Sequence, residues 1–338
     1  MTPSVDLPYR LLREAPSEPV LTVDGALGAE GLELSHWPGN RTPVEFRHRL
    51  STGAALAFAR LAPAEREARL RGLACVANNH YDTDGLCATW TVLNPERALV
   101  LAEPLLWTAA AGDFFQVPDE AAFARDIVIQ ACSDRARSPI AADFEGLDDH
   151  DRLVRASAHV LENLGSWLES DLDRGALTAL EHLWSPALQR LRADRAELEG
   201  ARRDERSSID LTLFEIDAEH DRLPGRHALF AGTERDRVLL AAHSDSGTRY
   251  RLVVGTRSWF DLDPREAPPS RFDLERARDR LSALEPDRGN SGWHCDRGPH
   301  PSPELWFGRP GQPAFTEHHD LLDPSQLAPN VVLDALGQ

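Results

Sequence analysis

The feature that most constrains this chain is a short apolar run, LACVANN at 73–79, followed at once by HYDTDG at 80–85. A run of this length, ended by turn residues, is typical of a strand buried in a parallel sheet. The small and apolar residues 86–93 that follow predict a helix packed behind the HYDTDG loop. A buried strand, an acidic loop and a helix in this order indicate a βαβ unit, whose functional groups lie at the carboxyl ends of its strands.

Further strand and helix patterns precede and follow this unit. VLTVD at 20–24 predicts a short buried strand, and LSHWPGNRTP at 34–43 is expected to be the loop after a second strand. A helix is expected over 44–70, and RALVLAEPLL at 97–106 predicts the start of another strand. The N-terminal part therefore has the pattern of a parallel sheet with helices.

The pattern changes towards the C-terminus. Residues 119–205 are helical in pattern, and the charged run that ends them is typical of a solvated helix leading into a linker. Beyond it we expect strands at 209–217, 227–232, 237–244, 250–260 and 304–308, with a helix at 272–285. The prediction is an α/β protein with a parallel-sheet domain at 1–150, a helical connector at 151–205 and a smaller mixed α/β domain at 206–338.

Charge excludes several functions. The chain has a formal net charge of −18 and contains no lysine, so it has no Walker-type phosphate loop, no Schiff-base lysine and no Ser-Lys dyad. Its negative charge repels a nucleic-acid backbone, which makes nucleic acid an unexpected partner. There is also no GxSxG motif, and no GxGxxG after a strand, to support acyl transfer or dinucleotide chemistry.

The same composition predicts a cytoplasmic location. No segment approaches the roughly 20 consecutive apolar residues of a membrane span, so we expect no membrane partner. The first residues lack the layout of a signal peptide. The four cysteines are scattered without a CxxC pair, which favours buried structural thiols in a reducing compartment. The oligomeric state stays open.

The HYDTDG loop contains three potential ligands at alternating positions, His80, Asp82 and Asp84. In an extended segment, residues two apart point the same way, so the three side chains could converge. Two carboxylates this close repel each other unless a cation lies between them, and carboxylates with imidazole suit Mn²⁺, Mg²⁺ or Zn²⁺. The alternative is an Asp-rich turn that only caps the next helix.

Three neighbouring polar residues have open roles. Asn78 and Asn79 could orient ligands or touch substrate, or could simply end the strand. His36, in the tight SHWPGN turn, could supply an additional imidazole ligand, or could be a structural histidine beside Trp37.

A strand followed by H-x-D-x-D-G and a helix of small residues resembles the first motif of the DHH phosphoesterase superfamily. The resemblance implies that His80, Asp82 and Asp84 are ligands of a two-manganese centre, with Mg²⁺ or Zn²⁺ as alternative metals. It also implies a further aspartate ligand, for which Asp113 in AAAGDFF is the best candidate. Asp84 and Asp113 would then be the catalytic carboxylates. LSHWPGN and NNHYDTDG also resemble motifs of an uncharacterised bacterial family.

A second resemblance lies near the C-terminus. GTRSWF, FDLERARDRLSALE and GNSGWHCD follow one another as do the strand, helix and glycine-rich loop of the domain associated with DHH proteins. This implies that four residues contact the substrate phosphate: Gly289, Ser291, Gly292 and His294. The Asp-His-His triplet of the superfamily is absent, and its nearest substitutes are Asp148-Asp149-His150-Asp151 and Glu317-His318-His319.

Three functions follow from these observations. The first is a metal-dependent phosphoesterase or pyrophosphatase, which uses metal-activated water on a small phosphorylated compound or nucleotide. The second is a non-catalytic nucleotide- or metal-binding protein derived from the same fold, for which the absent triplet is the main argument. The third is a single-metal hydrolase of a non-phosphate bond.

Overall fold

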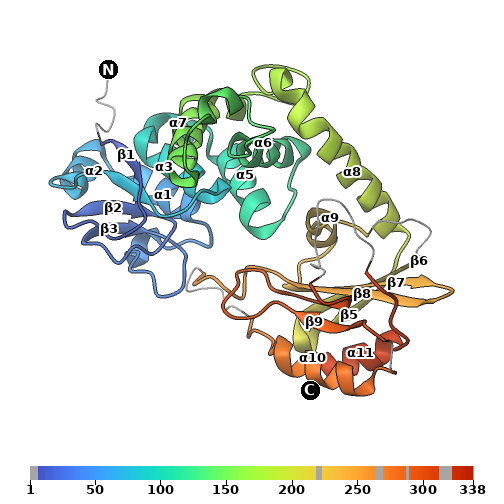
Figure 1. Ribbon diagram of the computed structural model, residues 1–338. Helices are drawn as coiled ribbons and strands as arrows, with labels where there is room; N and C mark the ends of the chain where they lie inside the picture. The colour runs from blue at the N-terminus through green and yellow to red at the C-terminus, as the bar shows by residue number, and fades with distance from the viewer. Residues whose placement is uncertain (1–6, 218–222, 263–268, 287–288, 312–321, 338) are drawn as a thin grey trace. The chain divides into compact units, whose positions relative to one another are not determined.

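The chain contains two compact units in the computed structural model, which describes residues 7–217, 223–262, 269–286, 289–311 and 322–337. The first unit comprises Met1–Gln189 with Phe260–Ala267, and the second comprises Arg190–Trp259 with Pro268–Gln338 (Figure 1). The first unit contains a parallel sheet and the second a mixed sheet, which confirms the predicted α/β class. The predicted domain boundaries near 150 and 205 stay predictions.

The sheet of the first unit has four parallel strands in the order β1-β4-β2-β3. The central strands β4 and β2 are apolar and are buried over their whole length, as strands inside a parallel sheet are expected to be. The strands are β1 (Tyr9–Leu11), β2 (Val20–Val23), β3 (Gly31–Leu34) and β4 (Val76–Asn78).

Helices make up most of the first unit. They are η1 (Val44–Phe46), α1 (Ser51–Ala59), α2 (Pro63–Leu70), α3 (Thr83–Leu93), α4 (Pro95–Val100), α5 (Ala102–Phe114), α6 (Glu120–Cys132), η2 (Ala141–Phe144), α7 (Asp149–Leu168) and η3 (Thr178–Leu180), followed by α8 (Glu181–Glu199), which crosses the division between the units. α1 and α3 are buried on almost every side, as helices at the centre of a core are. Leu21 and Val23 of β2 pack in one cluster with Ala54 and Phe58 of α1.

Two predictions for the first unit were wrong in detail. The stretch 97–106, predicted to begin a strand, is helical and belongs to α4 and α5. A short apolar run has no periodicity that separates a buried strand from a buried helix. The single helix predicted over 44–70 is divided into η1, α1 and α2, because Pro63 lacks a backbone N–H and begins a new helix at its first position.

The second unit contains a six-stranded mixed sheet in the order β5-β6-β7-β8-β10-β9. Only β6 and β7 pair in parallel, and the other pairs are antiparallel. The elements are β5 (Arg202–Arg206), η4 (Ser207–Ile209), β6 (Leu211–Asp217), α9 (Arg226–Ala231), β7 (Arg237–Ser244), β8 (Gly247–Val254), α10 (Leu274–Leu284), β9 (Gly292–Cys295), β10 (Glu304–Gly308) and α11 (Pro329–Leu336).

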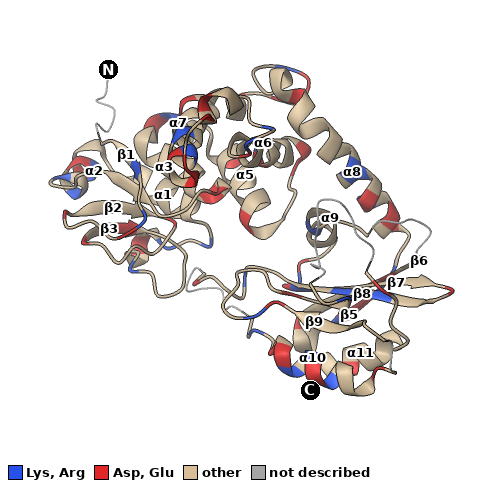
Figure 2. Ribbon diagram, viewed as in Figure 1, with Lys and Arg blue, Asp and Glu red and all other residues tan. Residues whose placement is uncertain are grey.

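One face of this sheet packs on α10 and α11. Tyr250, Leu252 and Val254 alternate along β8 on that face and share a core cluster with Leu281 of α10 and Val332 of α11. The neighbouring β8 residues Arg249 and Arg251 therefore point to the opposite face. Figure 2 shows a basic patch followed by acidic patches along the C-terminal half of α8. Leu191, Asp194 and Leu198 of this half are buried, so the helix is not solvated on every side.

Three predictions for the second unit need correction. Residues 227–232, predicted as a strand, form most of α9 and its C-cap at Gly232. The charged stretch 202–206, predicted to continue a helix, is the edge strand β5. The predicted glycine-rich loop at 288–298 contains the strand β9, which pairs with β10.

No helix among the described residues is both long and apolar enough to cross a membrane. All four cysteines are free thiols; Cys75, Cys87 and Cys132 are buried, as predicted for structural thiols.

Candidate metal centre

Polar residues follow three adjacent parallel strands at one edge of the first sheet. Asp24 comes directly after β2, His36 two residues after β3, and His80 two residues after β4. β4, β2 and β3 are hydrogen-bonded neighbours that run in the same direction, so their carboxyl ends meet. This is the edge at which open α/β sheets bind ligands.

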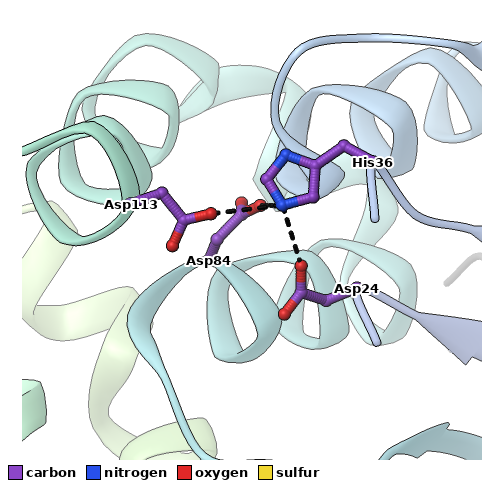
Figure 3. A group of neighbouring side chains, drawn as sticks. All are labelled: Asp24, His36, Asp84 and Asp113. Carbon is purple, nitrogen blue, oxygen red and sulfur yellow. Dashed lines mark ion pairs between the residues drawn. The ribbon is translucent and has the colours of Figure 1, made fainter. Parts of the chain in front are cut away.

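Three carboxylates surround Nε2 of His36, and Figure 3 shows the four side chains converging from separate elements. His36 Nε2 lies 3.3 Å from Asp24 Oδ1, 3.2 Å from Asp113 Oδ2 of α5 and 3.7 Å from Asp84 Oδ2 of α3. Asp24, His36 and Asp84 are wholly buried. We call this set (Asp24, His36, Asp84 and Asp113) the His36 group.

A second set shares Asp24 with the first. Nε2 of His80 lies 2.9 Å from Asp24 Oδ2 and 2.8 Å from Asp82 Oδ2. We call Asp24, His80 and Asp82 the His80 group. Its two outer side chains are partly exposed, His80 by 29% and Asp82 by 26%, so this side of the centre faces solvent.

The Asp24 carboxylate lies between the two groups. Its Oδ1 faces His36 and its Oδ2 faces His80, and Ser51 at the start of α1 donates its hydroxyl to Oδ1 at 2.8 Å. Asp24 has a φ of +63°, a left-handed conformation that aspartate tolerates better than most residues. An aspartate at this turn can therefore present one oxygen to each group.

The two imidazoles are oriented by hydrogen bonds to their other nitrogen. Nδ1 of His36 lies 2.7 Å from the carbonyl oxygen of Arg49, which only accepts, so Nδ1 carries the proton. Nδ1 of His80 lies 2.7 Å from Oδ1 of Asn79. Both contacts leave Nε2 to face the carboxylates, and such a second contact is what fixes the tautomer of metal-binding histidines.

Aromatic rings fix the surroundings of both histidines. Phe260 stacks on His36, with ring centroids 3.7 Å apart and an interplanar angle of 15°. Asp261, the next residue, donates its backbone N–H to the carbonyl of His36 at 2.8 Å. Trp37 meets His80 edge-on at 5.1 Å. The imidazoles are therefore held by packing as well as by hydrogen bonds.

The two remaining carboxylates of the HYDTDG segment are also helix caps. Asp84 accepts the backbone N–H of Ser51 at 2.7 Å and of Thr52 at 2.9 Å, at the first turn of α1. Asp82 caps its own helix α3 by accepting the N–H of Gly85 at 2.8 Å through Oδ1, while its Oδ2 faces His80. Asp82 can therefore cap α3 with one oxygen and face His80 with the other.

Two of the donor separations match the size of a divalent cation. Ligands about 2.1 Å from one ion are about 3.0–3.4 Å apart in octahedral or tetrahedral geometry. The separations of 3.2 and 3.3 Å from His36 Nε2 fall in this range. Nε2 of His36 and Oδ2 of Asp24 are buried and make no hydrogen bond of good geometry among the described residues. Two buried polar atoms without such a bond are consistent in chemistry with metal ligands.

Charge gives a second reason for a cation. The two groups contain four carboxyl groups and two imidazoles, so two negative charges remain when all four carboxyl groups are ionised and both imidazoles are protonated. Burial raises the pKa of Asp84 to about 6, against the positive charge of His36. Burial also raises the pKa of Asp113 and of Asp82. Carboxyl groups that resist ionisation here would ionise readily beside a bound cation.

The two histidines hold their protons more tightly than a free imidazole does, because they lie beside carboxylates. Burial opposes protonation of His80, but the Asp82 charge and close contacts with Asp24 outweigh it and raise its pKa to about 12. Burial likewise opposes protonation of His36, and contacts with Asp113 and Asp24 raise its pKa well above the usual value. Asp24 has a lowered pKa, because its contacts with both histidines outweigh burial. A cation must therefore displace protons from the imidazoles.

The structure brings all four predicted ligands into the two groups. His80 and Asp82 belong to the His80 group, and Asp84 and Asp113 to the His36 group. The segment is not extended as predicted, because α3 begins at Thr83; Asp84 faces His36, whereas Asp82 faces His80. Asp113 was expected to follow a strand, but it lies near the C-terminal end of the helix α5.

Sequence reasoning missed Asp24 and left His36 undecided. Asp24 directly follows a buried strand, the same signal that pointed to the HYDTDG loop, and was read only as the last residue of that strand. Asn78 is buried and accepts the N–H of Asn79 at 2.7 Å and of Gly25 at 3.4 Å. Asn79 is exposed and contacts His80. A substrate role for either asparagine stays a prediction.

The four residues predicted to contact substrate phosphate belong to the second unit. Ser291 donates to Asp323 at 2.7 Å, and Nε2 of His294 lies 3.0 Å from the carbonyl of Gly308. Gly292 begins β9, and Gly289 has a φ of +67°. Their contact with substrate stays a prediction.

The first of the two substitutes for the Asp-His-His triplet, residues 148–151, is not part of either group. Asp148 is an exposed cap of α7 that accepts the N–H of Asp151, and it pairs with Arg13. Asp149 is exposed and pairs with Arg135. Glu317, His318 and His319 lie outside the described residues.

The fold and the two groups define an α/β chain with a candidate dinuclear metal centre at the carboxyl edge of a parallel sheet. The chain belongs to a family of unknown function, DUF6687, whose profile matches residues 6–336. No curated protein matches it.

Proposed function

We propose that this chain is a cytoplasmic phosphohydrolase that uses two divalent ions, Mn²⁺ being the favoured metal, on a small phosphorylated compound. The observation that carries the proposal is the position of Asp24, whose two oxygens face two different histidines. A carboxylate shared in this way is suited to bridging two ions. The resemblance of NNHYDTDG to the first DHH motif supports phosphoryl chemistry at this centre.

Each group would hold one ion. The His36 group offers Asp24 Oδ1, His36 Nε2, Asp84 and Asp113, all deeply buried. The His80 group offers Asp24 Oδ2, His80 Nε2 and Asp82, and its exposure leaves room for water and substrate. When bound, a pair of divalent ions supplies an activated water and neutralises phosphoryl oxygens, so no nucleophilic side chain is required.

The residues of the chain preorganise this centre. Ser51 holds Asp24, and the first N–H groups of α1 hold Asp84. Arg49 and Asn79 orient the two imidazoles through Nδ1. A ligand shell held in place before the ions arrive loses little freedom on binding them.

Charge supports a small substrate. A net charge of −18 repels long polyanions, whereas the ions would neutralise the charge of one small phosphate group locally. We therefore propose a small phosphate ester, a pyrophosphate or a nucleotide in preference to nucleic acid.

One observation favours the non-catalytic alternative. Both oxygens of Asp84 are engaged by α1 and the side chain is wholly buried, as in a purely structural cap. In that case the metal would stabilise the fold, or bind a nucleotide, without turnover.

Phosphate release separates the two functions. Purified protein would be incubated with Mn²⁺ and a panel of pyrophosphate, nucleotides and sugar phosphates, and Asp82→Asn would be compared with wild type. Asparagine still caps α3 but weakens the His80 group. The control is Asp148→Asn, at an exposed cap outside both groups. Mn²⁺-dependent turnover that is lost only in Asp82→Asn supports a hydrolase; bound Mn²⁺ without turnover on any substrate favours the binding protein.

A further inference from the structure

One edge of a buried arginine in the second unit has no acceptor in the part of the chain that the structure describes. Arg237, at the start of β7, is only 2% exposed. Its Nη1 donates to the carbonyl of Ile209, and its guanidinium lies 3.7 Å above the ring of Phe272. Nε and Nη2 are buried and have no hydrogen-bond partner among the described residues. Nε and Nη2 lie on one side of the planar guanidinium group, and this side can bind a carboxylate or phosphate through two parallel hydrogen bonds.

A second arginine, Arg271, directly precedes the Phe272 on which Arg237 stacks, and it also has a buried donor without a partner among the described residues. Nη2 of Arg271 donates to the carbonyls of His300 at 2.7 Å and Pro301 at 3.3 Å. Its guanidinium lies 5.0 Å from the ring centroid of Trp259. Nη1 is buried and has no partner in the described part of the chain. Arg271 is half-buried, so the pair extends from a buried donor at Arg237 to one nearer the surface.

The two positive charges affect each other. Burial lowers the pKa of Arg237, and the charge of Arg271 lowers it further, while Asp236 and Asp210 act in the opposite direction. The oxygens of Asp236 accept the backbone N–H groups of Arg257 and Ser258, and Asp210 accepts from Arg235 and from the N–H of Asp236. Both carboxylates therefore offset the positive charge of Arg237 without accepting a hydrogen bond from its Nε or Nη2.

We propose that Arg237 and Arg271 form an anion site in the second unit that binds a phosphate group. Three donor atoms, Nε and Nη2 of Arg237 and Nη1 of Arg271, have no acceptor among the described residues. A buried guanidinium whose donors are only partly satisfied is unfavourable, and a tetrahedral dianion supplies several acceptor oxygens and compensating charge. The carbonyl and aromatic contacts hold both arginines in place, so the donors are preorganised.

This site is independent of the proposed hydrolase function, because it uses no residue of the His36 or His80 group. Its occupant is either inorganic phosphate or the phosphate of a small ester. The proposal would place a second phosphate-responsive element on the same chain as the candidate metal centre.

The test uses the full chain in EDTA, so that phosphate binding through metal is excluded. Thermal unfolding and isothermal titration would be measured with inorganic phosphate and with glycerol 2-phosphate, against chloride at equal ionic strength. The variants are Arg271→Gln and Arg237→Met. The control is Arg280→Gln, which is also half-buried and donates to a single carbonyl, that of Ala335.

Wild type and Arg280→Gln are expected to be stabilised by phosphate, and Arg271→Gln to bind it about tenfold more weakly. Arg237→Met is expected to lose the response yet to be as stable as wild type in chloride, because an uncompensated buried charge has been removed. A stronger response to the ester than to inorganic phosphate identifies an organic phosphate as the occupant, and the reverse identifies inorganic phosphate.

Two results would overturn the proposal. One is a wild-type protein that responds to phosphate no more than to chloride. The other is an unchanged phosphate response in Arg271→Gln. Strong destabilisation of Arg237→Met in chloride would also count against it, because the protein itself would then compensate the guanidinium.

Discussion

Oδ1 of Asp24 lies 3.3 Å from Nε2 of His36, and both side chains are wholly buried. The contact joins the ends of β2 and β3, two neighbouring strands of the parallel sheet. A charged pair in such a position is costly unless further partners complete it. The partners here are Asp84, Asp113 and, across the other oxygen of Asp24, His80, so the whole centre depends on one shared carboxylate.

The first prediction concerns Gly85, where α3 passes close to the centre. A Cβ at this position would lie 2.1 Å from Nδ2 of Asn78 and 2.8 Å from Oδ1 of Asp82. Asn78 is buried and hydrogen-bonded, so it has little room to move. Gly85→Ala should destabilise the metal-free protein by about 1–3 kcal/mol and weaken Mn²⁺ binding.

Chemical denaturation and Mn²⁺ titration of Gly85→Ala would check this. The control is Gly200→Ala, whose Cβ would meet its nearest atom at an ordinary 3.6 Å. Equal behaviour of the two variants would show that the space beside Asp82 is not restricted.

The second prediction concerns pH in the absence of metal. A raised carboxyl pKa gives stability that is present below the ordinary value of about 3.9 and is lost as pH rises through the folded value, about 6 for Asp84. A raised histidine pKa gives stability that is complete below about 6.5 and declines towards the folded value, about 12 for His80. Both contributions to stability decrease as the pH rises. EDTA-treated protein should therefore melt at a lower temperature at pH 8 than at pH 5.5.

Mn²⁺ should act in the opposite direction, because the ligands must lose protons to bind it. The rise in melting temperature on adding Mn²⁺ should therefore be larger at pH 8 than at pH 5.5. Thermal scans of wild type and Asp84→Asn at both pH values would measure this, with a weaker pH dependence expected in the metal-free variant. Metal-free wild type that becomes more stable from pH 5.5 to pH 8 would contradict the assignment.

The third prediction concerns a buried ion-pair cluster in the second unit. Glu304 is 1% exposed and accepts from Arg251 at 2.9 and 3.0 Å and from Arg226 at 2.7 Å. Burial opposes its ionisation, but the two arginines outweigh it and lower its pKa. This stability is present above about pH 4.3 and is lost as pH falls through the lowered value.

Glu304→Gln should therefore cost about 3 kcal/mol at pH 7, because it leaves buried guanidinium charge without its counterion. The loss relative to wild type should shrink below pH 4. Urea denaturation at both pH values would measure it, with Glu275→Gln on the exposed side of α10 as the control. A loss at pH 7 no larger than that of Glu275→Gln would show that the cluster contributes little.

The sequence located much of the centre because part of it is local. His80 and Asp82 follow a buried strand within a few residues, and that spacing alone indicated ligands at the carboxyl end of a sheet. Asp113 was reached through a family resemblance, although it lies on a helix where a strand was expected. The run 97–106 was predicted as a strand but is helical. A short apolar run has no periodicity that distinguishes a strand from a helix.

The rest depends on the order of strands in space. Asp24 and His36 meet because β2 lies between β4 and β3, and chain order does not specify this arrangement. The division of His80, Asp82 and Asp84 between two groups depends on where α3 begins, which is a matter of one or two residues. A shared carboxylate can be seen only once all three strand ends are placed together.

The most direct test of the account is the number of Mn²⁺ ions bound per chain, measured by equilibrium dialysis on wild type, Asp82→Asn and Asp24→Asn. Asparagine tolerates the left-handed backbone of residue 24, so Asp24→Asn changes the charge without straining the turn. The account predicts two ions in wild type, one in Asp82→Asn and none bound tightly in Asp24→Asn. No ion in wild type, or two ions in Asp24→Asn, would contradict it.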